Sequence, residues 1–169
     1  MILSDTISAI ATPNGEGGIG IIRLSGPLAI PISTVLFHPS RQISDIKSYT
    51  IHHGQVIDPE SNQVVDEVLL NVFRSPKSYT TEDMVEFNCH GGSIILRRVL
   101  ELTLKHGARI ADPGEFTKRA FLNGRIDLAQ AEAVIDLIQA KSDIARQMAV
   151  DQLGGKLSQT IESINDQII

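Results

Sequence analysis

A helix start, a helix stop and a second helix start fall within residues 113–140, and this stretch constrains the fold of the 169-residue chain more than any other. The first start is marked by Asp112, which can cap a helix whose first turn carries Pro113 and Glu115. Proline is favoured at the first helical position, and the acidic residue completes a capping-box arrangement. The sequence therefore predicts a helix that begins at Pro113.

The stop and the second start follow closely. Asn123-Gly124 is typical of a helix that ends in the left-handed conformation. Asp127, with Gln130 three residues later, has the pattern of a capping box for the next helix. We therefore expect a short joint between two helices, which holds the basic side chain of Arg125 in a defined place.

The composition of the chain changes near residue 121. All seven prolines lie at or before Pro113 and every aromatic residue lies at or before Phe121, whereas the remainder is rich in Ala, Gln, Asp, Ile and Leu. In the first part, runs of β-forming residues bounded by Pro, Gly and Asn predict strands, and apolar residues at helical spacing predict two helices. The predicted strands are residues 6–12, 18–25, 48–57, 64–73, 83–89 and 109–111, and the predicted helices are residues 27–37 and 93–105.

These patterns predict an α+β fold, in which a mixed β-sheet with packed helices occupies residues 1–118 and the beginning of a helical domain occupies residues 119–169. Four apolar residues in the last segment follow a heptad-like spacing: Leu157, Ile161, Ile164 and Ile168. Gly154-Gly155 is expected to break this helix from the preceding one. Because the chain ends within the apolar seam, we expect it to be a fragment of a longer protein.

Composition and charge exclude several classes of protein. The net charge of −5 argues against a sequence-independent nucleic-acid binder, because such binding needs clustered Lys and Arg. The single cysteine, Cys89, excludes an internal disulfide framework and is typical of a reducing compartment. The N-terminal residues lack the basic region of a signal peptide, and no apolar run is long enough to span a bilayer. We therefore expect a cytoplasmic location.

Two glycine motifs resemble nucleotide-binding signatures, and both fail on their context. Residues 15–20 match G-x-G-x-x-G, but the strand-like residues 21–25 follow where a helix is required. A flexible turn between two strands is the better interpretation, although a glycine backbone can still lie beside a ligand. Gly155-Lys156 lacks both the preceding strand and the following Ser or Thr of a P-loop, since Leu157 stands there.

Two charged residues on predicted strands are candidates for a binding site. Arg23 shares a strand face with Ile19 and Ile21, and Glu86 alternates with apolar neighbours on another strand. A charge held on such a face needs an opposite charge or a ligand, because an unpaired buried charge is costly. From the residues alone, an internal Arg23–Glu86 ion pair and a ligand site both remain open.

The histidines and the cysteine form no metal-binding signature. Cys89 and His90 are adjacent, so a strand would point them to opposite faces, and His52-His53 has the same difficulty. We expect Cys89 to be a buried, inert thiol, because no base can be assigned to it. We predict no metal site and no catalytic residue in this chain.

Three segments, residues 5–26, 75–92 and 113–140, closely resemble the N-terminal part of the MnmE (TrmE) family of tRNA-modification GTPases. The resemblance implies an N-terminal domain like the tetrahydrofolate-binding domain of glycine-cleavage T-proteins, which pairs as a homodimer, followed by a helical domain. It also implies that the family's folate contacts fall on Arg23, Glu86 and Arg125. The last of these positions is lysine in some relatives, so here a planar fork replaces a point charge.

The resemblance carries further expectations about the full-length protein. A GTPase domain inserted in the helical region binds GTP with Mg²⁺ and K⁺, and the protein works with the FAD-dependent partner MnmG (GidA) as a heterotetramer. Together they modify C5 of the wobble uridine (position 34) of certain tRNAs, and a folate such as 5-formyltetrahydrofolate carries the one-carbon unit. This chain is thus expected to bind folate and dimerise, without catalysis of its own. A purely structural assembly module without folate binding and a free-standing aminomethyltransferase-like enzyme are the alternatives.

Overall fold

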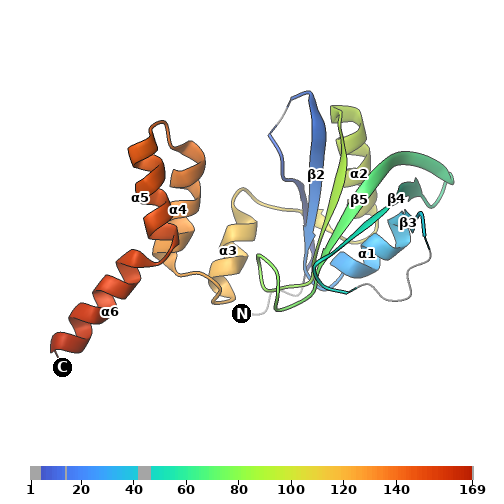
Figure 1. Cartoon of the computed structure of the whole chain (residues 1–169). Coiled ribbons are helices and arrows are strands. Elements are labelled where there is room, and N and C mark those ends of the chain that lie inside the picture. Colours follow the sequence, from blue (N-terminus) through green and yellow to red (C-terminus); the bar gives the residue numbers. More distant parts are fainter. Residues whose placement is uncertain (1–4, 14, 42–46, 169) are drawn as a thin grey trace. The chain divides into compact units, whose positions relative to one another are not determined.

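The computed structural model of the chain describes residues 5–13, 15–41 and 47–168. They divide into two compact units, at residues 1–114 and 115–169 (Figure 1). The first unit contains strands and helices, and the second contains helices within its described residues. The α+β class is therefore confirmed.

The first unit is built on a seven-stranded mixed sheet, with the strand order β3-β4-β5-β6-β2-β1-β7. Neighbouring strands are antiparallel except for β7, which runs parallel to β1. Its strands are β1 (Ile7–Ile10), β2 (Gly17–Ser25), β3 (Phe37–Pro39), β4 (Thr50–Asp58), β5 (Gln63–Phe73), β6 (Met84–Gly91) and β7 (Arg109–Ile110).

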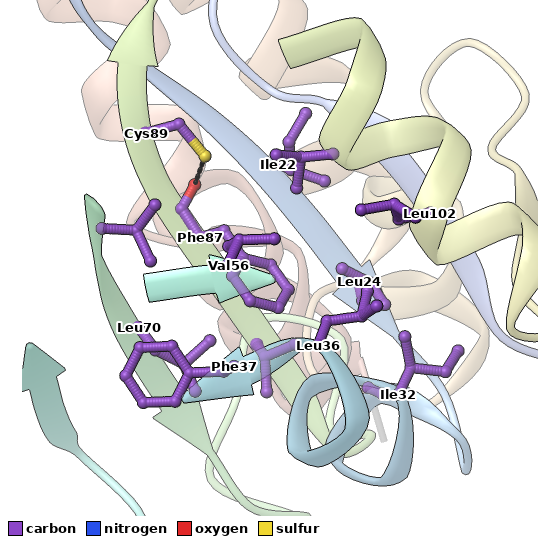
Figure 2. Packing of buried hydrophobic residues seen from close by; sticks show 14 of the residues in the cluster. Ile22, Leu24, Ile32, Leu36, Phe37, Val56, Leu70, Phe87, Cys89 and Leu102 are labelled. Atoms are coloured by element: carbon purple, nitrogen blue, oxygen red, sulfur yellow. Dashed lines mark hydrogen bonds between the residues drawn. The ribbon is translucent and has the colours of Figure 1, made fainter. Parts of the chain in front are cut away.

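The hydrophobic core lies between one face of this sheet and two helices, α1 (Ala29–Leu36) and α2 (Ser93–Lys105). Figure 2 shows Ile22 and Leu24 of β2 packed among side chains from α1, α2 and the neighbouring strands. Phe87 of β6 lies in the same cluster and is fully buried. The helices therefore cover the face that carries the even-numbered residues of β2, while Arg23 lies on the other face.

The second unit consists of helices α3 (Glu115–Leu122), α4 (Leu128–Gln139), α5 (Asp143–Leu153) and α6 (Lys156–Ile168). Helices α4 and α5 lie side by side (Figure 1). Asp127 accepts a hydrogen bond from the Gln130 backbone N–H at 2.8 Å, and the Gln130 side chain accepts one from the Asp127 N–H at 2.9 Å. The predicted capping box is therefore confirmed.

The joint before α4 is a Schellman motif. The Gly124 N–H donates to Phe121 O at 3.0 Å, and the Arg125 N–H donates to Ala120 O at 2.9 Å. Gly124 has φ 72°, which a residue without a Cβ adopts easily. The predicted left-handed stop is confirmed.

Two expectations need correction. Helix α3 begins at Glu115, so Pro113 is not its first residue; Gly114, with φ 73°, lies between them and turns the chain into the helix. The short strand β3 follows α1 directly, and the sequence pattern missed it. The strands predicted from residue 6 to residue 111 are otherwise present with ends shifted by a few residues, and α2 has the predicted bounds.

The break at the glycine pair is confirmed, since Gly154 and Gly155 separate α5 from α6. Leu157, Ile161 and Ile164 of the predicted seam are exposed, and the side chain of Ile168 lies outside the described residues. The domain boundary at residues 118 and 119 and the likeness to glycine-cleavage T-proteins stay predictions.

Two residues of α2 test how the core depends on this helix. Leu102 is 2% exposed and Ile94 is 80% exposed. We expect Leu102→Ala to lower the free energy of unfolding by about 2–5 kcal/mol, because it removes buried methyl groups and leaves a cavity. The matched control Ile94→Ala should change it by less than about 0.5 kcal/mol. Urea denaturation followed by circular dichroism measures both, and equal losses would contradict this packing.

Candidate functional site

The first candidate site is an ion pair in the middle of the sheet, on the face opposite the helices. Antiparallel pairing of β2 with β6 places Arg23 directly across from Glu86. Both Arg23 Nε, at 2.8 Å, and Arg23 Nη2, at 2.7 Å, reach the same carboxylate oxygen, Oε1. The side chains are only 29% and 12% exposed, so the pair is partly shielded from solvent.

Two further side chains complete this arrangement. Asn71, which faces Glu86 from β5, places its Nδ2 at 3.5 Å from Glu86 Oε2, the outer limit of a hydrogen bond. The Tyr79 ring lies under the guanidinium, with 5.9 Å between Arg23 Cζ and the ring centroid. The site therefore combines a cation, an anion, an amide and an aromatic ring.

The Arg23–Glu86 ion pair, which was one of the two alternatives left open by the sequence, is present. Its geometry is uneven, because Oε1 accepts from both Arg23 nitrogens, whereas among the described residues Oε2 has only the long contact from Asn71. A carboxylate with one weakly used oxygen can accept a hydrogen bond from a planar N–H edge of a ligand. An internal pair and a ligand site are thus compatible in the same side chains.

The third predicted site residue, Arg125, belongs to the second unit. Its backbone is fixed by the Schellman motif described above, and the residue is exposed. The tight joint predicted around Arg125 is therefore observed, and a shared site with Arg23 and Glu86 stays a prediction.

The glycine-rich residues at the start of β2 border a separate hollow of about 180 Å³. The strand predicted after this loop is confirmed, and its pairing with β6 is interrupted by an irregularity between Gly17 and Ile19. The lining of the hollow comes from β2, β4, β5 and β6: Gly18, Ile19, His53, Glu67, Val68, Leu69, Asn88, Cys89 and His90.

The sequence did not reveal two histidine–carboxylate pairs at this hollow. His90 Nδ1 lies 2.6 Å from Asp66 Oδ1, and the His90 backbone N–H donates to Oδ2 at 2.8 Å. His53 Nε2 lies 2.6 Å from Glu67 Oε1. The fold brings Asp66 and His90 together although they lie 24 residues apart in the chain, and no local pattern connects them.

The hydrogen bond that the His90 ring donates to Asp66, together with the negative charge of Asp66, raises the pKa of His90 above 6.5, and Glu67 contributes in the same direction. Burial raises the pKa of the Cys89 thiol to about 12. Cys89 therefore stays protonated at neutral pH, which confirms the expectation of an inert, buried thiol. In the parts of the chain that the structure describes, no three His, Cys, Asp or Glu residues gather as a metal site, and no helix is long and apolar enough to cross a membrane.

Comparison with known proteins identifies the family. The model of the GTP-binding protein TrmE N-terminus matches residues 6–125, and the model of the MnmE helical domain matches residues 128–169. The chain belongs to the MnmE (TrmE) family. The first match ends and the second begins at the joint that contains Arg125 and Asp127.

Curated relatives support this assignment over nearly the whole chain. The tRNA modification GTPase MnmE of Staphylococcus haemolyticus is 53% identical over 98% of this chain and 36% of that protein. The corresponding protein of Carboxydothermus hydrogenoformans is 55% identical over 99% of this chain and 37% of its own length. That of Staphylococcus aureus is 54% identical over 98% and 36%. The chain thus spans little more than a third of the relatives that it matches.

The Asp66–His90 pair predicts a pH-dependent contribution to stability. Because the folded-state pKa of His90 is raised above 6.5, the contribution is fully present below 6.5 and is lost as the pH rises through the folded-state pKa. We expect Asp66→Asn to return the His90 pKa toward 6.5, measured by NMR titration of the ring protons. In the control Glu101→Gln, on the exposed part of α2, the His90 pKa should stay raised. A His90 pKa that is the same in wild type and Asp66→Asn would contradict this assignment.

Proposed function

We propose that this chain is the folate-binding and dimerising part of a tRNA-modification GTPase. The observation that carries the proposal is the Arg23–Glu86 pair, on the sheet face opposite α1 and α2 and within the residues that match the TrmE N-terminal model. The set of side chains suits a pterin: a carboxylate that accepts from an amino-pyrimidine edge, a guanidinium that donates to carbonyl oxygens, and an aromatic ring beside them. When bound, the folate supplies a one-carbon unit.

The two charged residues take different roles in this proposal. Glu86 accepts hydrogen bonds from the amino-pyrimidine edge, for which Oε2 is the less occupied oxygen, at 3.5 Å from Asn71. Arg23, together with Arg125, donates to the carbonyl, formyl or glutamate oxygens of the ligand. Tyr79 keeps the Arg23 guanidinium over the sheet face while the ligand replaces some of the hydrogen bonds between Arg23 and Glu86.

The relatives are named tRNA modification GTPases. For the complete protein, we propose the same activity, which is tRNA modification linked to GTP hydrolysis. The finer steps are part of the same proposal: C5 modification of the wobble uridine, a homodimer, the MnmG partner, and Mg²⁺ and K⁺ with GTP, in the cytoplasm. Gly155-Lys156 does not fit a P-loop for GTP, because Gly155 lies between α5 and α6, Lys156 begins α6, and the element before them is a helix, not a strand.

A second candidate function is a purely structural assembly module. It is favoured by the same ion pair, because Arg23 and Glu86 neutralise each other without a ligand. The two candidates differ in whether the chain binds a reduced folate saturably.

Isothermal titration with 5-formyltetrahydrofolate decides between them. We expect wild type to bind saturably and Glu86→Gln to bind at least about 10-fold more weakly, because the amide replaces an acceptor by a donor. Glu101→Gln is the matched control and should bind like wild type. Unchanged affinity in Glu86→Gln would contradict the assigned role, and absence of binding by wild type would favour the structural module.

Arg125 requires its own test, because its role depends on the family resemblance. We expect Arg125→Ala to weaken folate binding by about 10-fold and Arg125→Lys to weaken it less, since lysine keeps the charge but loses the planar fork. Arg146→Ala, at an exposed position on α5, is the control. If all three variants bound folate as tightly as wild type, Arg125 would not be a folate contact.

A further inference from the structure

A second hollow, of about 330 Å³, lies at the edge of the sheet that ends in β3. Its volume is at the lower end of the range for small-ligand sites, about 300–1,000 Å³. Its lining comes from the residues after β3 and from the start of β4: Ser40, Arg41, Ile51, His52 and His53. All of these side chains except Ile51 can donate hydrogen bonds and none is acidic, so the hollow suits an anion.

The charge of this part of the chain differs from the charge of the whole. Residues 37–57 contain two basic residues, Arg41 and Lys47, and three of the five histidines, against one acidic residue, Asp45, whereas the whole chain carries −5. Arg41 is exposed, and within the described residues no carboxylate lies at ion-pair distance from its guanidinium. Arg41 can therefore pair with an anionic ligand, which the local positive potential attracts.

A hydroxyl, an imidazole and a carboxylate form a line at this hollow. Ser40 Oγ lies 2.9 Å from His53 Nδ1, and His53 Nε2 lies 2.6 Å from Glu67 Oε1. The Ser40 N–H also donates to His53 O at 3.0 Å, which fixes Ser40 beside β4. Because a carboxylate only accepts hydrogen bonds, Nε2 carries a hydrogen whether the ring is neutral or charged. The protonation of Nδ1 therefore sets the direction of the Ser40–His53 hydrogen bond.

The state of Nδ1 determines whether Ser40 can bind an anion. When His53 is neutral, Nδ1 accepts the hydrogen of the Ser40 hydroxyl, and the hydroxyl can then only accept from a ligand. When His53 is protonated, Nδ1 donates to Ser40 Oγ, and the hydroxyl hydrogen can donate to a ligand oxygen. An anion held by Ser40 therefore favours the protonated ring, so anion binding is linked to uptake of a proton by His53.

The charges around the His53 ring are compatible with this linkage. The charged and titratable groups that border the ring or the two hollows on either side of it are Arg41, His52, Glu67, Asp66 and His90. Glu67 offsets the charge of a protonated His53, and Asp66 does the same for His90. An anion between Arg41 and His53 reduces the repulsion between their positive charges.

The arrangement of donors suits a tetrahedral oxyanion. A guanidinium presents two parallel N–H groups to a phosphate, and arginine and serine are among the side chains that hold nucleic-acid phosphates. Ile51 is 67% exposed on the rim, and it offers apolar surface to the sugar that follows the phosphate.

We propose that this hollow binds a phosphodiester group of an RNA strand through Arg41 and Ser40, with uptake of a proton by His53. The RNA source rests on the function proposed above, in which the complete protein acts on tRNA, whereas the phosphate chemistry rests on the hollow alone. The net charge of −5 confines such a contact to this local site. A free phosphate ion presents the same chemistry, and the experiment separates the two sources.

Fluorescence anisotropy of a labelled single-stranded oligouridylate measures the affinity of the chain at about pH 6 and about pH 8. We expect binding at least about 3-fold tighter at the lower pH, which favours a protonated imidazole. Arg41→Gln should weaken binding about 10-fold and reduce the slope of log K against log salt concentration by about 0.7, the value for one phosphate of a single strand. Arg97→Gln, at an exposed position on α2, is the matched control and should bind like wild type.

The proton linkage has its own variants. His53→Gln should make the affinity the same at both pH values, and Ser40→Ala should weaken binding at the lower pH while it leaves every charge in place. His38→Gln, at an exposed position on β3, is the control and should keep the difference between the two pH values. Circular dichroism checks that each variant is folded.

Several results would overturn the inference. They are absence of oligouridylate binding by wild type, equal affinities in Arg41→Gln, Ser40→Ala and wild type, and a pH dependence that persists in His53→Gln. Inorganic phosphate is the second arm, followed through the NMR signals of the His53 ring. If phosphate shifts these signals saturably and the oligouridylate does not, the ligand is a free phosphate ion and the RNA source is wrong.

The folate titration separates a failure of this inference from a failure of the proposed function. Folate binding that needs Glu86, with oligouridylate binding unchanged in Arg41→Gln, would overturn this inference and leave the folate role standing. Oligouridylate binding that needs Arg41, without folate binding by wild type, would support the phosphate site and contradict the folate role.

Discussion

The pairing of β2 with β6 is the constraint on which the rest of the first unit depends. These strands lie near the centre of the sheet, and their register places Ile22 opposite Phe87 on the helix-covered face and Arg23 opposite Glu86 on the other. A slip of β6 by one residue would turn Glu86 toward the core and Phe87 away from it, so Arg23 would lose its partner. Burial of Ile22 and Phe87 in the core therefore stabilises the register that places Arg23 and Glu86 opposite each other.

Much of the fold and part of the site could be predicted because they follow from local patterns. Helix α2 was predicted with its observed bounds, and the alternation in β2 and β6 placed Arg23 and Glu86 away from their buried neighbours. Asp127 and Gln130 gave the start of α4 because a capping box involves only nearby residues. Strand β3 was missed because three residues directly after a helix leave no periodic signal.

The Asp66–His90 pair shows why the remainder could not be predicted. By alternation, Asp66 belongs to the same face as the buried Val68, which gives no reason to connect it with His90. The paired residues of β5 and β6 extend only to Leu69 and Asn88, and beyond them the Asp66 carboxylate accepts the His90 N–H. The Asp66 side chain thus takes the place of a backbone acceptor on β5. This contact depends on where β5 and β6 separate, which a local sequence pattern does not indicate.

The neutrality of the Arg23–Glu86 pair has a consequence for how the chain responds to ionic strength. Opposite charges 2.7 Å apart produce little field at a distance, and salt screens charges that lie beyond about 10 Å at 0.1 M. A ligand recognised by short hydrogen bonds to this pair would lose little affinity as salt is added. Association with RNA releases counterions and weakens steeply under the same conditions. Salt concentration is therefore a variable that distinguishes the two kinds of association in a protein with a net charge of −5.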